Sequence, residues 1–141
     1  MDFNTFDAIA QKYGTPFYLM DGEVYLANIS AFQNAFKPLY DKLVIGYSFK
    51  TNYVPALCKI AKDAGCYAEV VSEMEYTLAK RIGFEKIIFN GPIKKEDILK
   101  TALADKAIIN LDSRYELDTV LEYKATHPQA VSYTHLRAHE T

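Results

Sequence analysis

Lys50 is the residue whose type and position most clearly indicate chemistry. It follows an apolar, strand-like run at 43–47, and a helical pattern begins directly after it, with Pro55 in the expected first turn. In α/β barrels, catalytic side chains gather where a β-strand ends and leads toward a helix. Partial desolvation makes a lysine nucleophilic, so that its amine can form a Schiff base with an aldehyde cofactor. The alternative interpretation is an ordinary solvated surface lysine.

Polar residues also occur where the later strand-like runs end. They are Glu69 and Ser72 at the second run, Asn90 and Gly91 at the third, and Asp112 and Ser113 at the fourth. Because the carboxyl ends of parallel strands share one face, we expect these residues to lie on the same face as Lys50. No other lysine has this placement. Lys94 and Lys95 stand beside two acidic residues and are expected to form a solvated helix start.

The elements that position these residues alternate regularly from residue 43 onward. Apolar runs occupy 43–47, 67–71, 86–89 and 107–111, and helical patterns occupy 54–64, 73–82, 95–104 and 114–125. The starts of the runs lie 24, 19 and 21 residues apart, which is the period of a repeating βα unit. Strands linked by helices in this way must be parallel. Nearly continuous apolar runs are typical of strands that are covered on both faces.

Two S-x-x-E capping boxes support the boundaries between strands and helices. Ser72 with Glu75, and Ser113 with Glu116, each follow an apolar run directly. Capping is also the purely structural interpretation of these four residues. The segment before residue 43 predicts a helix that ends at Gly14, a short strand at 16–20 and a second helix capped by Asp21. The apolar stripe of that second helix is expected to be core; it comprises Tyr25, Ile29, Phe32, Phe36 and Leu39.

The predicted fold class is therefore α/β, with four parallel strands and their helices arranged as the N-terminal half of a (β/α)8 TIM barrel. A small doubly wound sheet is the alternative. The segment after the first run, 48–52, contains neither G-x-G-x-x-G nor G-K-[ST]. The absence of both motifs argues against a nucleotide-binding Rossmann or P-loop protein.

Composition excludes several other classes of function. The chain is 50% hydrophobic and 24% charged, as ordinary globular proteins are, and its net charge of −2 argues against nucleic acid or anionic membrane as a partner. No apolar run approaches the length of a membrane span, and the N-terminus lacks a signal-peptide pattern. Cys58 and Cys66 form no C-x-x-C pair, so we expect reduced, buried thiols and a cytoplasmic protein. No metal site is predicted.

The last eleven residues do not continue the pattern before them. Residues 131–141 resemble a translated transposase-type sequencing adapter, and Ala130 fits the codon at the junction. We therefore expect 1–130 to be a partial domain and 131–141 a non-native tail. The alternative is a genuine polar tail, in which His135 and His139 would stand at the i, i+4 spacing of a metal pair. Nothing before them offers further ligands.

Four motifs, in the same order along the chain, resemble the alanine-racemase-like pyridoxal-phosphate decarboxylases, the group of diaminopimelate and ornithine decarboxylases. Residues 13–18 are similar to the family's entry segment, and 47–52 to its Y-x-x-K-x-N signature. Residues 69–75 are similar to its D-V-x-S-x-x-E stretch, and 109–117 to its fourth-strand motif. Glu69 departs from the pattern, because the family usually has aspartate there.

The resemblance implies a function and a set of site residues. Lys50 would form the Schiff base with pyridoxal 5'-phosphate, and Glu69 and Ser72 would contact the cofactor. The full-length parent would be a homodimeric carboxy-lyase of lysine biosynthesis acting on a basic or dibasic amino acid, with diaminopimelate the best single substrate. The family's Gly-rich phosphate-binding loop and C-terminal β-domain come later than residue 130, so residues 1–130 would be a partial cofactor-binding domain.

Two alternatives to this function stay open. An amino-acid racemase on the same scaffold is disfavoured, since the racemase pattern has a Gly-containing tyrosine loop soon after the lysine and residues 51–54 do not. The chain could also be a truncated, inactive gene product, because half a barrel leaves strand edges and an apolar interior exposed. Re-reading the source DNA beyond codon 130 separates that interpretation from an enzyme of ordinary length.

Overall fold

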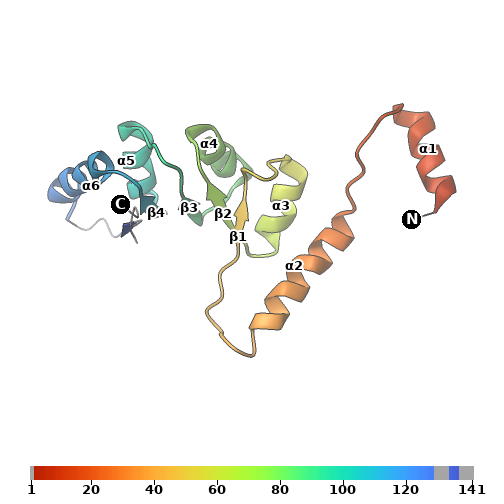
Figure 1. Cartoon of the computed structure of the whole chain (residues 1–141), viewed down its shortest axis with the longest axis horizontal. Coiled ribbons are helices and arrows are strands. Elements are labelled where there is room, and N and C mark those ends of the chain that lie inside the picture. Colours follow the sequence, from red (N-terminus) through yellow and green to blue (C-terminus); the bar gives the residue numbers. More distant parts are fainter. Residues whose placement is uncertain (1, 129–133, 137–141) are drawn as a thin grey trace, which may run out of the picture.

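The structure, a computed structural model, describes residues 2–128 and 134–136. Helices and strands alternate through most of this part of the chain (Figure 1). The helices are α1 (Phe3–Tyr13), α2 (Gly22–Phe36), α3 (Pro55–Asp63), α4 (Glu73–Ile82), α5 (Glu96–Ala104) and α6 (Arg114–Thr126). The strands are β1 (Gly46–Ser48), β2 (Tyr67–Val70), β3 (Ile87–Phe89), β4 (Ile108–Leu111) and β5 (Thr134–Leu136).

The strands form one parallel sheet in the order β1-β2-β3-β4-β5. Strands β1 to β4 and helices α3 to α6 confirm the prediction of four βα units with parallel strands. Each of these helices begins within one residue of its predicted start. A fifth strand, β5, pairs with β4 and falls inside the segment 131–141 that we expected to be a non-native tail. The boundary at residue 130 stays a prediction.

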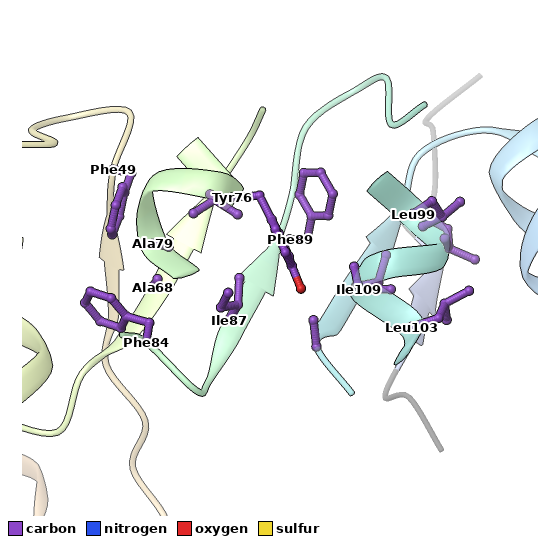
Figure 2. Close-up of a cluster of buried hydrophobic side chains, with 14 of the residues drawn as sticks. Phe49, Ala68, Tyr76, Ala79, Phe84, Ile87, Phe89, Leu99, Leu103 and Ile109 are labelled. Carbon is purple, nitrogen blue, oxygen red and sulfur yellow. The ribbon is translucent and has the colours of Figure 1, made fainter. Parts of the chain in front are cut away.

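Burial alternates along the strands and places the hydrophobic core on one face of the sheet. In β2, Ala68 and Val70 are buried, whereas Tyr67 and Glu69 are partly exposed, and β3 and β4 repeat this alternation. Figure 2 shows the buried side chains of the strands gathered with residues of α4 and α5. The ring of Tyr76 lies 5.3 Å from that of Phe89, centroid to centroid, and so joins α4 to β3.

Neither N-terminal helix contributes a buried residue to this core, although α2 lies against α3, where Gln33 Nε2 donates to Ala64 O at 3.0 Å. Helix α1 ends at Gly14 and α2 is capped by Asp21, as predicted. The predicted strand at 16–20 is wrong, because the segment has no strand partner and is irregular. The prediction that the α2 stripe is core is also wrong, since α2 has no buried residue and Phe32 is 51% exposed. Figure 1 shows α1 standing away from the sheet.

Candidate functional site

The candidate site lies on the second face of the sheet, which we call the open face. Strand pairing brings partly exposed residues side by side on it: Ser48 pairs with Glu69, Glu69 with Ile88, and Ile88 with Ile108. Gly46 belongs to the same face, and a Cβ atom there would meet Ile88 Cδ1 at 3.2 Å. The open face therefore combines a close-packed apolar base with polar side chains toward the carboxyl ends of the strands.

Lys50 lies in the turn that follows β1, at the carboxyl end of the sheet, as predicted. Ser48 O accepts hydrogen bonds from the backbone N–H groups of Thr51 at 3.2 Å and Asn52 at 3.4 Å, which closes this turn. The Lys50 side chain is exposed. Within the described residues it makes no hydrogen bond and no ion pair, so its amine is available to a ligand.

Tyr47 supports the Lys50 turn from the core side. Its hydroxyl donates to Asn52 O at 2.8 Å, and Asn52 Oδ1 in turn accepts from Val54 N–H at 2.9 Å, at the start of α3. Burial raises the pKa of the Tyr47 phenol above its ordinary value. The phenol therefore stays protonated and keeps this bond at neutral pH.

Glu69, the second predicted site residue, is held by a ladder of side-chain amides across three strand ends. Asn90 Nδ2 donates to Glu69 Oε1 at 2.6 Å, and Asn110 Nδ2 donates to Asn90 Oδ1. The ladder gives the Glu69 carboxylate a defined position on the open face. Asn110 was missed as a site residue, although its place between buried Ile109 and Leu111 in an alternating strand assigns it to this face.

Ser72, the third predicted site residue, acts in the cap of α4. Its Oγ accepts from Glu75 N–H at 3.3 Å, and Glu75 Oε2 accepts from Val71 N–H at 2.7 Å. Ser113 and Glu116 cap α6 in the same way. Ser72 also lines a hollow of about 680 Å³ between α4 and α5, together with Leu78, Phe89 and Ile98. In the described part of the chain, no hydrogen bond links it to Lys50 or Glu69.

The prediction that Lys94 belongs to a solvated helix start is wrong. Its side chain is fully buried, and its Nζ lies 3.2 Å from Glu116 Oε2 and 3.5 Å from Asp112 Oδ2. The two acidic residues next to Lys94 in the sequence suggested a solvated site. Its actual partners, Asp112 and Glu116, belong to the next βα unit and are not its sequence neighbours. Lys95 does match the prediction, since it is 81% exposed and pairs with Glu73.

The described residues offer little support for thiol or metal chemistry. Cys58 and Cys66 are free and buried, and burial raises the pKa of both thiols above the ordinary value, which disfavours a reactive thiolate. The residues that the structure describes contain no group of three or more His, Cys, Asp and Glu side chains able to hold a metal ion. Among them, no helix combines the length and apolarity of a membrane span. His139 of the alternative metal pair lies outside the described residues.

A comparison with protein families matches residues 26–139 to the model described as "Pyridoxal-dependent decarboxylase, pyridoxal binding domain". Diaminopimelate decarboxylase of Methanocaldococcus jannaschii is 35% identical over 126 residues, which cover 83% of this chain and 29% of that protein. The probable chloroplastic diaminopimelate decarboxylase of Oryza sativa is 32% identical over 117 residues, covering 82% and 24%. The chain therefore spans less than a third of the length of these relatives.

Solved structures show the same relationship. The M. jannaschii diaminopimelate decarboxylase in co-complex with L-lysine superimposes with a TM-score of 0.81 at 28% identity, over 92% of this chain and 31% of that one. Lysine/ornithine decarboxylase of Vibrio vulnificus, complexed with putrescine, has a TM-score of 0.74 at 22% identity, which supports the fold alone. These neighbours are barrel decarboxylases, and this chain matches their N-terminal portion, as the predicted half-barrel requires.

Proposed function

This chain belongs to the pyridoxal-dependent decarboxylase family, and on that premise we propose that it is the lysine-bearing part of an amino-acid decarboxylase active site. The parent protein would remove the α-carboxyl group of a basic or dibasic amino acid. The observation that carries the proposal is Lys50, an exposed amine in the turn after β1, beside the open face of a parallel sheet.

The residues of the open face fit pyridoxal phosphate in their chemistry. A Schiff base with the aldehyde of the cofactor requires a primary amine. Lys50 offers one without a competing partner in the described residues. A cationic ring nitrogen is favoured by a carboxylate, and Glu69 is present with its position fixed by Asn90. When bound, the cofactor accepts the electrons left on the substrate as carbon dioxide departs.

Each residue has a distinct proposed role. Lys50 would hold the aldehyde group of the cofactor through its Nζ. Glu69 would stabilise positive charge on the cofactor ring, and its side chain is one methylene longer than the family's usual aspartate. Ser72, whose Oγ already caps α4, would contact the cofactor through the remaining capacity of its hydroxyl group. Tyr47 keeps the Lys50 turn closed through its bond to Asn52.

The substrate we propose is diaminopimelate. The similar proteins from M. jannaschii and O. sativa, at 35% and 32% identity, are named diaminopimelate decarboxylase and probable diaminopimelate decarboxylase. We also propose that the full-length parent is a homodimer, because the family resemblance implies that a second subunit completes the site.

Borohydride reduction tests the role of Lys50. Full-length protein is incubated with pyridoxal phosphate, reduced and digested, and the peptides are mapped by mass spectrometry. We expect pyridoxyl mass on Lys50 and none on Lys95, an exposed lysine that serves as the internal control. Label confined to any other lysine would refute the proposal. Carbon dioxide release from diaminopimelate, lysine, ornithine and arginine then identifies the substrate.

A further inference from the structure

The least expected group in the structure is the buried cluster of Lys94, Asp112 and Glu116, which we call the Lys94 clasp. The Lys94 and Glu116 side chains are 0% and 1% exposed, and that of Asp112 is 6% exposed. Burying charge costs free energy unless each group is paired and hydrogen-bonded. An ion cluster away from Lys50 and Glu69 therefore requires an explanation.

The clasp ties the loop after β3 to the junction between β4 and α6. Glu116 Oε1 accepts from the Lys94 backbone N–H at 2.9 Å, and Glu116 Oε2 accepts from Asp112 N–H at 2.8 Å. Lys94 Nζ also donates to Gly91 O at 2.7 Å. The loop after β3 is thus held at Gly91 and at Lys94, and the β4–α6 junction is held at Asp112.

Gly91 connects the Lys94 clasp to the open face through the backbone. Its φ of +104° favours glycine, and a Cβ atom there would collide with the Val71 carbonyl oxygen. The loop is therefore pressed against the end of β2 on one side and held by Lys94 on the other. Asn90, the residue directly before Gly91, is the centre of the ladder that holds Glu69.

We infer that Lys94 is a positioning residue, which fixes the 90–94 loop so that Asn90 holds the Glu69 carboxylate in place on the open face. As a role in catalysis this rests on the proposed function; as a role in the geometry of the open face it does not. The competing explanation is that the clasp only stabilises the fold. The two explanations predict different results when the hydrogen bond from Lys94 Nζ to Gly91 O is lost in a protein that is still folded. Only the positioning role predicts that Asn90 is then disturbed.

The first test uses the 141-residue chain and nuclear magnetic resonance. Lys94→Met alone would leave two buried carboxylates without their cation, so the double variant Lys94→Met/Glu116→Gln is used with it to reduce this charge imbalance. We expect the side-chain amide resonances of Asn90 and Asn110 to move in the folded double variant. The control Lys95→Met should leave them unchanged, since Lys95 is exposed.

Backbone amide exchange separates positioning from stability. Asn90 N–H donates to Val70 O beside the loop, and Ala68 N–H donates to Lys86 O within the sheet. Local loosening should accelerate exchange at Asn90 by roughly tenfold relative to Ala68. Equal acceleration at both amides, with unmoved Asn90 side-chain resonances in the double variant, would overturn the inference.

The second test uses the full-length holoprotein. In the double variant we expect kcat to fall by about tenfold with KM within about twofold of wild type, while borohydride still labels Lys50. An unchanged kcat would refute the catalytic role of the clasp. Absence of label on Lys50 in the wild-type protein would refute the proposed function instead, and would leave the resonance result for the clasp intact.

Discussion

Asn90 donates its side-chain amide to Glu69 Oε1 over 2.6 Å and so links the ends of β3 and β2 on the open face. Hydrogen bonds to charged groups are worth more than neutral ones, but solvent reduces the gain at a partly exposed site. The bond therefore orients Glu69 more than it stabilises the protein. This distinction can be measured.

Asn90→Ala should lower the free energy of unfolding by about 1 kcal/mol, because Glu69 loses its donor and Asn110 its acceptor while both stay partly exposed to water. Urea denaturation of the variant and wild type measures the difference. Gln11→Ala is the matched control, since it removes an exposed amide-carboxylate bond to Asp7 on α1. A control that costs as much as Asn90→Ala would contradict the assignment of the ladder.

Ser72→Ala should destabilise the protein by about 1 kcal/mol through loss of the α4 cap. Ser113→Ala should cost a similar amount at α6, where the same cap is present. Denaturant unfolding measures both. The pair also tests the proposed cofactor contact, because only Ser72→Ala should then weaken pyridoxal phosphate binding in the full-length protein. Equal binding in both variants would assign Ser72 to capping alone.

Lys94→Met should destabilise the chain by roughly 3–5 kcal/mol, the usual cost of removing one partner from a buried ion pair. Lys95→Met should change stability by less than about 1 kcal/mol, because its partner Glu73 is 57% exposed. The two lysines are adjacent in sequence, so this comparison isolates burial. Similar unfolding midpoints for the two variants would contradict the buried position of Lys94.

The periodic signals in the sequence predicted the four βα units closely, since apolar runs and capping boxes are local patterns. Burial of Lys94 could not be predicted in this way, because Glu116 lies 22 residues further along the chain and the pairing depends on tertiary packing. The prediction that the α2 stripe is core was wrong for a different reason. Its apolar spacing is real, but Phe32 and Phe36, whose ring centroids lie 4.9 Å apart, both stay exposed.

Tyr76 predicts how stability depends on alkaline pH. Burial, with a hydrogen bond to Asp105 Oδ2 at 2.8 Å, raises the pKa of this phenol above its ordinary value of 10.0. A group whose pKa is raised on folding contributes stability that is fully present below its unfolded pKa and is lost as pH rises toward the folded value. The free energy of unfolding should therefore decline from about pH 10 upward.

Tyr76→Phe should make that alkaline decline shallower, because one of the phenols that must ionise on unfolding is removed. Tyr18→Phe is the control, since Tyr18 is fully exposed and should leave the slope unchanged. Urea denaturation between pH 9 and pH 11, about one unit on either side of the expected onset, measures the slope. A steeper decline in Tyr76→Phe than in wild type would contradict the assignment.

The 141-residue chain alone should neither decarboxylate basic amino acids nor bind pyridoxal phosphate tightly. A phosphate group needs backbone N–H groups or cations that converge on it, and on the open face the described residues offer only Lys50 and side-chain amides. Imine formation without a phosphate anchor is weak and unspecific. The exposed open face and apolar side chains such as Phe3, Leu39 and Ile93, each 81% exposed, should also favour association between copies.

Titration of the chain with pyridoxal phosphate, followed by absorbance, measures this binding, and trapping of carbon dioxide measures turnover. Pyridoxal without its phosphate is the matched ligand control, and we expect it to bind as weakly as the phosphorylated form. Saturation at micromolar concentrations of pyridoxal phosphate alone, or any turnover, would show that these residues already form a complete site. The open face would then be the active site itself, and not the lysine-bearing part of a larger one.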